Sequence, residues 1–159
     1  MIACRATTVQ DFNNELTTNG LLDGGVFYFG HAGRLQSSGT VYSALYVGQD
    51  PIPTENLTSR NVAALSGAQL GQNASVTLNG CDAGVRTPDG GPSIAQLISN
   101  QLRRGVYAYD VGMYFSSKNA ANDPHRNGVG RNGPIDLPVY MVPEGTPFNK
   151  PAPIPFTSQ

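Results

Sequence analysis

The sequence predicts an α/β protein, a three-layer domain in which a mostly parallel sheet of about five or six strands is flanked by helices. Two observations lead to this fold class. Between Val26 and Asp110, short apolar runs that end at glycine alternate with helical patterns, as in a sheet with right-handed crossovers. The length of 159 residues corresponds to a single domain, 1–159, in which residues 119–159 are expected to form a loop- and proline-rich C-terminal extension packed on the rest.

The first part of the chain contains three patterns. Apolar residues recur at helical spacing after Thr8, which suits a helix N-cap, and Asn19-Gly20 ends this helix. The continuous apolar run Val26–Phe29, bounded by glycines, predicts a strand that is covered on both faces. Residues 39–48 predict extended structure, in the form of a hairpin arm on a sheet edge.

The alternation continues in the middle of the chain. A helix is expected to begin at residue 58 or 59 and to finish near residue 67 or 71, with two apolar side chains directed inward. A strand over Ser75–Asn79 follows. The clearest helix covers residues 92–105, with a proline in its first turn, one apolar stripe, two arginines near its end and a glycine stop. Residues 106–109 predict the next strand.

The chain changes character after Lys118, where turn residues dominate. The glycine pattern of residues 128–133 follows no strand and opens no helix, so a dinucleotide site is not expected. Residues 137–142 predict one more strand. The end, from Pro143, carries five prolines and is expected to lie extended over the body, where it could cover a sheet edge.

The composition limits the classes of partner. Ten basic and eleven acidic side chains give a formal net charge of -1, and only 13% of the residues are charged. No basic stripe offers the electrostatic footprint that nucleic acid needs, and no apolar run approaches the length of about 20 residues that crosses a bilayer. The first residues lack a charged leader followed by an apolar segment, so neither a signal peptide nor a transmembrane segment is expected.

Metal and disulfide chemistry would depend on two cysteines and two histidines, Cys4, Cys81, His31 and His125. They lack the paired close spacing of a structural zinc site, so neither a metal nor another cofactor is expected. A disulfide between Cys4 and Cys81 stays open, although such sparse cysteine usage is more typical of a reducing compartment. His125 is expected in a solvated loop.

Two of these residues closely follow predicted strands. Val26–Phe29 is followed within two residues by His31, and Ser75–Asn79 is followed within two residues by Cys81. Reactive groups gather beyond the carboxyl ends of parallel strands, so neighbouring strands would bring the imidazole and the thiol together. A thiol is mostly protonated at neutral pH, and a histidine beside it makes it a nucleophile. The pair therefore predicts a cysteine hydrolase. Taken singly, Cys81 also suits a buried core position, and His31 a loop position bonded to backbone carbonyls.

The residues around this pair resemble a known family. The segments Gly30-His31-Ala32-Gly33 and Asn79-Gly80-Cys81-Asp82-Ala83-Gly84, followed by a helix and a strand, look like the caspase-like superfamily (clan CD) of cysteine peptidases, which includes the CHAT domains. His31 precedes Cys81 by 50 residues (81 minus 31), the order and about the spacing of the caspase signature. The resemblance covers residues 22–114. In overall texture the chain also resembles the C-terminal effector domains of Rhs-type polymorphic toxins.

The resemblance implies catalytic roles. Cys81 would attack the scissile carbonyl, and His31 would protonate the leaving amine. The backbone N–H of Cys81 and one from Ala32 or Gly33 would form the oxyanion hole. Many relatives have glycine directly after the histidine, whereas here Ala32 comes before Gly33, so either of the two backbone groups could donate.

The resemblance also implies a substrate. Asp110, with Asp82 behind it, would line the primary specificity pocket and pair with a basic side chain, although Asp110 also suits a turn cap. The expected function is a cysteine endopeptidase that cleaves proteins, in the form of a toxin effector acting on proteins of a target cell. A cognate immunity protein or the parent Rhs shell would be its partner. The protein is expected in the cytoplasm of the producing cell or inside the target cell.

Three alternatives use the same fold. The chain could be a self-processing protease of a larger precursor, or it could hydrolyse a non-peptide amide such as glutamine. It could also be a non-catalytic caspase-like binding module, in which the crevice is presented to a partner. Reactivity of Cys81 distinguishes the binding module from the other two.

Overall fold

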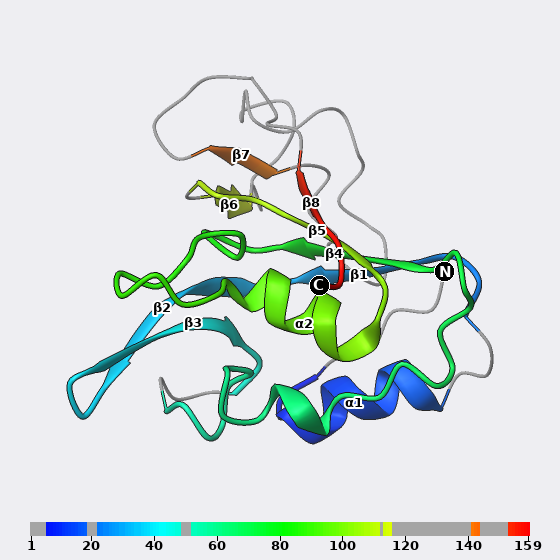
Figure 1. The fold of residues 1–159 in the computed structure, drawn as a ribbon, viewed down its shortest axis with the longest axis horizontal. Helices are drawn as coiled ribbons and strands as arrows, with labels where there is room; N and C mark the ends of the chain where they lie inside the picture. The colour runs from blue at the N-terminus through cyan, green and yellow to red at the C-terminus, as the bar shows by residue number, and fades with distance from the viewer. Residues whose placement is uncertain (1–5, 19–21, 49–51, 112, 116–140, 144–152) are drawn as a thin grey trace.

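The structure is a computed structural model that describes residues 6–18, 22–48, 52–111, 113–115, 141–143 and 153–159. Its elements are two helices, one 3-10 turn and eight strands (Figure 1). In chain order they are α1 (Val9–Thr17), β1 (Gly25–Phe29), β2 (His31–Ser37), β3 (Thr40–Tyr46), η1 (Val62–Ala64), β4 (Ser75–Asn79), α2 (Ile94–Leu102), β5 (Gly105–Ala108), β6 (Met113–Phe115), β7 (Met141–Pro143) and β8 (Ile154–Phe156).

The main sheet has the strand order β1-β4-β5-β8, in which β1, β4 and β5 are parallel and β8 is antiparallel to β5. The α/β class and the mostly parallel sheet are therefore confirmed. In the described part of the chain this sheet has four strands rather than five or six. The difference arises because β2 and β3 pair only with each other, as do β6 and β7. The β2–β3 hairpin, drawn in cyan, extends beyond the sheet (Figure 1).

The core lies on one face of this sheet. Alternate residues of the central strands, such as Val76, Leu78 and Val106, are fully buried and form one cluster with apolar residues of α1 and α2. On the opposite face, Phe27 and Phe29 are 55% and 40% exposed. The run Val26–Phe29 therefore alternates and is not buried on both faces. Among the described residues both helices pack on the same face, so a third layer is not found in that part of the chain.

The first helix begins as expected. Thr8 caps α1, because its hydroxyl accepts from the backbone N–H of Asp11 at 3.0 Å. The Asp11 carboxylate accepts from the hydroxyl and the N–H of Thr7, and these bonds hold the pKa of Asp11 below its usual range. The helix then buries Phe12 and Leu16 against the sheet.

The helix expected to begin at residue 58 or 59 is much shorter in the structure, where only the 3-10 turn η1 forms. Its start is capped, but the N–H groups of Ala64 and Leu65 bond to carbonyls three residues back, and Leu65 is already extended (ψ 139°), so the helix does not continue. The Thr58 hydroxyl accepts from the N–H of Arg60, and the Asn61 side chain accepts from the N–H of Thr58. Val62 and Leu65 are nevertheless buried, as the apolar pattern indicated.

The helix expected over residues 92–105 is α2. Ser93 caps it by accepting from the N–H of Gln96 at 3.2 Å. Its end differs from the expectation, because Arg103 takes the left-handed conformation (φ 53°, ψ 42°) and Gly105 already begins β5. No helix within these described ranges is long and apolar enough to cross a membrane.

The predicted C-terminal extension is described in part. Residues 141–143 of the strand expected over 137–142 form β7, and residues 154–156 form β8 at the edge of the main sheet. Cys4, His125 and the glycine pattern of residues 128–133 lie outside the described residues.

Tyr28 joins the sheet to the β2–β3 hairpin. Its hydroxyl lies 2.9 Å from the Tyr46 carbonyl and 3.1 Å from the His31 carbonyl and shares its single proton between them. The hydroxyl passes directly over Gly30, where a Cβ would collide with the phenol ring of Tyr28. Glycine at this position therefore permits the contact that ties the start of β2 to β1.

Replacing Tyr28 with phenylalanine is expected to lower the free energy of unfolding at neutral pH by about 1 kcal/mol. Burial raises the pKa of Tyr28 above its ordinary value of 10.0, so only the unfolded chain ionises readily when the pH exceeds that value. The stabilisation that the Tyr28 hydroxyl contributes is then complete below about pH 10 and declines as the pH rises further. Urea unfolding should show a smaller alkaline loss for the variant than for the wild type, and equal losses would contradict this assignment.

Candidate active site

The ends of β1 and β4 lie side by side. The two strands are parallel neighbours with Phe29 opposite Asn79, and the Gly30 N–H donates to the Asn79 carbonyl at 3.3 Å. His31 and Cys81 each follow two residues after this pair. The residues that the sequence singles out therefore leave neighbouring strands at the same level of the sheet.

Gly80 is the point of closest approach between the two segments. A Cβ on Gly80 would lie 2.8 Å from the Cβ of Ala32 and 3.1 Å from the Gly30 carbonyl oxygen. Both chain neighbours of His31 thus pack on the residue that precedes Cys81. The structure brings the backbone of His31 next to that of Cys81, and a side chain at position 80 would separate them.

His31 is the first residue of β2, where it pairs with Tyr46 of β3 and has an exposed side chain. The chain leaves the sheet at Gly30 and enters the hairpin directly, so His31 lies in a hydrogen-bonded strand and not in a loop. The hydrogen bond from Tyr28 to the His31 carbonyl holds this first residue against the sheet.

Cys81 opens a tight turn on β4. Its half-buried side chain packs with Tyr109 and Val111 in a small cluster apart from the main core. Asp82 takes a left-handed conformation (φ 51°), and its N–H donates to the Val111 carbonyl at 3.1 Å. Gly84 donates to the Tyr109 carbonyl at 2.8 Å. Burial raises the pKa of Tyr109, so Cys81 borders a neutral phenol.

The two candidate oxyanion donors next to His31 differ in direction. Leu45 of β3 exchanges both backbone hydrogen bonds with Leu57, at 2.9 and 3.0 Å. Its partner Ala32 therefore occupies a non-hydrogen-bonded position of the β2–β3 ladder, and by alternation the next residue, Gly33, is hydrogen-bonded to Ala44. The Ala32 N–H therefore points away from β3, on the side of Gly80, whereas the Gly33 N–H is bonded to β3.

Gly33 has a conformational role instead. Its φ of 151° is unfavourable for residues with a side chain, although nothing lies within 4 Å of a Cβ built there. Glycine is needed here for the backbone path of β2, which begins at His31.

The two candidate specificity residues lie at the same edge of the sheet. Leu78 is opposite Ala108, so the exposed Asp110 comes level with Gly80, on the side of β4 away from His31. Asp82 is half-buried and bonded through its N–H to Val111. Three neighbouring parallel strands therefore carry His31, Cys81 and Asp110 just beyond their carboxyl ends.

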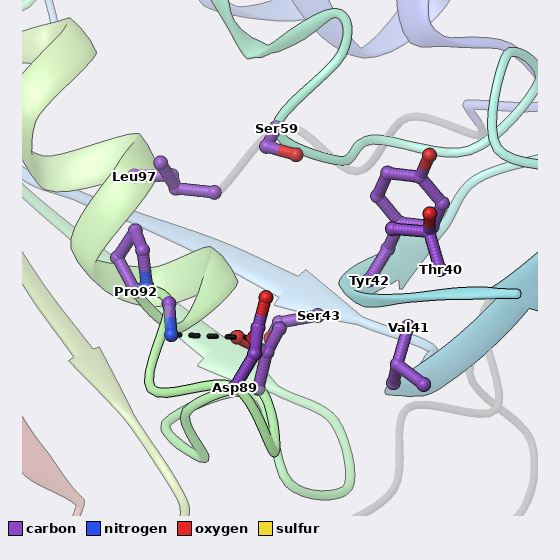
Figure 2. Close-up of a pocket in the computed structure, with 10 residues that line it drawn as sticks. Thr40, Val41, Tyr42, Ser43, Ser59, Asp89, Pro92 and Leu97 are labelled. Carbon is purple, nitrogen blue, oxygen red and sulfur yellow. Dashed lines mark hydrogen bonds between the residues drawn. The ribbon is translucent and has the colours of Figure 1, made fainter.

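A separate pocket lies where the hairpin meets α2. It encloses about 140 Å³ and is lined by the first half of β3, by Ser59, by four residues of the loop before α2 and by Leu97 of α2. Figure 2 shows Asp89 and Ser59 on opposite sides of the opening, with Tyr42 on one flank and Leu97 on the other. Neither His31 nor Cys81 lines it. The pocket is thus distinct from the paired strand ends.

The polar groups of this pocket serve the loop that leads into α2. The Ser43 hydroxyl accepts from the N–H of Ile94 at 2.9 Å and ties β3 to the helix. The neighbouring Thr87 hydroxyl and the Gly91 N–H lower the pKa of Asp89. These contacts organise the junction between hairpin and helix.

Several residues important to this geometry were not singled out by sequence reasoning. Tyr28 and Val111 hold the two sides of the site through contacts that no local pattern indicates. Tyr109 is buried and packs against Cys81. No group of three or more metal-ligating side chains occurs within the described residues, so the geometry supplies no metal centre there.

Comparisons with known proteins identify no relative of this chain: no protein-family model matches it, no curated protein matches it, and no solved structure matches it.

Proposed function

We propose that this chain is a cysteine endopeptidase in which Cys81 is the nucleophile and His31 is the general acid and base. One observation supports the proposal above the others. The strands that precede these residues are parallel neighbours in register, and His31 and Cys81 follow them by the same number of residues. Two reactive side chains at adjoining strand ends are typical of active sites in parallel sheets.

The reaction follows from the chemistry of the pair. His31 takes the thiol proton of Cys81, and the sulfur forms a bond to the scissile carbonyl carbon. The Ala32 N–H, at the Gly80 side of β2, and the N–H of Cys81 stabilise the oxyanion. His31 then gives the proton to the leaving amine as the carbon–nitrogen bond breaks. Water hydrolyses the thioester, with His31 as base, and the thiol is restored.

The substrate class follows from the resemblance to toxin effectors and is a protein of a target cell. The test is to express the wild type beside Cys81→Ala in bacterial and eukaryotic cells and to map new protein termini. New termini that depend on Cys81 support the proposal. Cleavage confined to a longer precursor of this chain would indicate self-processing instead. Equal toxicity and equal termini in both strains would overturn the catalytic role of Cys81.

Specificity is proposed to depend on Asp110, whose exposed carboxylate lies at the end of β5 beside the Cys81 turn. Asp110→Asn is expected to lower kcat/KM for peptides with Arg or Lys before the scissile bond by about 10- to 100-fold, because a charge-assisted hydrogen bond is lost. Asp89→Asn, in the separate pocket, is the matched control and should leave kcat/KM unchanged. A peptide-library digest without preference for Arg or Lys would contradict this role.

A further inference from the structure

The C-terminal residues form a separate strand on the sheet edge. β8 pairs with β5, with Phe156 opposite Val106 and Ile154 opposite Ala108. Pro155 lies opposite Tyr107, and Pro153 comes just before β8. Proline has no N–H, so β8 cannot donate there to another strand. The segment therefore ends the sheet.

Side chains of α2 hold the same segment by its backbone. The Ser99 hydroxyl shares its proton between the Arg104 carbonyl at 2.8 Å and the Phe156 carbonyl at 3.2 Å, and Gln96 donates to the Thr157 carbonyl at 2.8 Å. The N–H of Gln159 donates to the Asn100 side chain at 3.0 Å. In Figure 1 the end of the chain accordingly lies beside α2. These bonds act on the backbone and would hold the segment whatever its side chains.

Phe156 connects this segment to the turn that carries Cys81. A Cβ on Gly84 would lie 3.1 Å from the Phe156 ring and 3.2 Å from the Tyr109 carbonyl oxygen. Gly84 is therefore enclosed between the ring and the backbone of Tyr109, to which its own N–H donates. Because Cys81 packs on Tyr109, the ring of Phe156 closes the outer side of the turn that begins at Cys81.

We propose that residues 153–159 regulate the candidate active site, with Phe156 as a positioning residue for Cys81. When docked on β5 and α2, the segment holds the Cys81–Gly84 turn against Tyr109 and so fixes the end of β4 that carries the thiol next to the start of β2. When the segment leaves, the turn loosens and the thiol loses its alignment with the base. This inference rests on the proposed function for its effect on catalysis, whereas its effect on the turn does not require catalysis.

The test compares full-length variants Phe156→Ala, Phe156→Leu and Ile154→Ala. Ile154→Ala is the matched control, because it changes the same strand and its partner is Ala108, outside the turn. Alkylation of Cys81 by iodoacetamide is followed from about pH 6 to about pH 9, since only an activated thiol reacts quickly at the lower value. Amide exchange at Asp82 and Gly84 reports the turn directly.

We compare the rate of Cys81 alkylation at about pH 6 with the rate at about pH 9. Phe156→Ala is expected to lower the ratio of these two rates by about tenfold or more, because small displacements cost reactivity. Amide exchange at Asp82 and Gly84 should become faster in Phe156→Ala. Phe156→Leu should restore most of the alkylation ratio and of the slow exchange. Ile154→Ala should match the wild type in both measurements. A loosened but unaligned thiol would react faster at both ends, so the ratio separates positioning from simple exposure.

An unchanged ratio and unchanged exchange in Phe156→Ala would overturn the inference. If Phe156→Ala does not fold, Gln96→Ala, which removes the side-chain bonds to the Thr157 carbonyl and to Asn100, provides the same comparison and the same two readouts. Should wild-type Cys81 react as an ordinary thiol throughout, the proposed function fails. Exchange at Gly84 then still decides whether the segment holds the turn.

Discussion

Removal of either member of the dyad is expected to have the largest effect on activity. Cys81→Ala should lower kcat for peptide hydrolysis by about 10⁴- to 10⁶-fold, because the nucleophile is lost. His31→Ala should lower kcat by about 10²- to 10⁴-fold, because proton transfer to the leaving amine is lost. His31→Ala should also slow alkylation of Cys81 at about pH 6, where an unassisted thiol is protonated.

The chain contains its own matched controls for this experiment. It has one other cysteine, Cys4, and one other histidine, His125. Cys4→Ala and His125→Ala remove the same chemical groups without changing either member of the dyad and should retain wild-type hydrolysis and alkylation rates. If His31→Ala leaves the alkylation rate of Cys81 unchanged, the imidazole does not assist the thiol. The non-catalytic binding module would then be the better description.

The second large effect is expected at Gly80. Gly80→Ala introduces a methyl group that would meet the Cβ of Ala32 at 2.8 Å and the Ala32 nitrogen at 3.3 Å. The carbonyl oxygen of Gly30, another backbone atom, is also within contact range, so the conflict cannot be relieved by a side-chain rotation. The ends of β1 and β4 must separate, which moves His31 away from Cys81. A displacement of about 1 Å costs about 10²-fold in rate.

The stability of the Gly80→Ala variant separates positioning from unfolding. Overpacking of this kind lowers the free energy of unfolding by about 1–3 kcal/mol, which urea denaturation measures. Gly24→Ala and Gly105→Ala are the controls, since a Cβ at either position has nothing within 4 Å. The variant should remain folded at room temperature but lose activity. Full activity in folded Gly80→Ala would show that the two strand ends need no close approach.

Local patterns predicted the elements that depend on neighbouring residues in the chain. The N-cap at Thr8, the strand Ser75–Asn79 and the body of α2 follow from capping chemistry and apolar spacing, and all three are present. Patterns failed where the backbone left the helical path. The side chains of Thr58 and Asn61 cap the expected start, but Leu65 is already extended, so the predicted helix is reduced to η1.

By itself, the sequence determined that His31 and Cys81 follow strands closely, because apolar runs and glycines are local signals. Only the tertiary structure decided that these strands are in-register neighbours, that His31 begins a hairpin and that the Ala32 N–H lies at the side of Gly80. Contacts between distant segments, such as Phe156 on Gly84, leave no trace in local spacing. They form because side chains far apart in the sequence are buried against one another, and which of them meet depends on the fold of the whole chain.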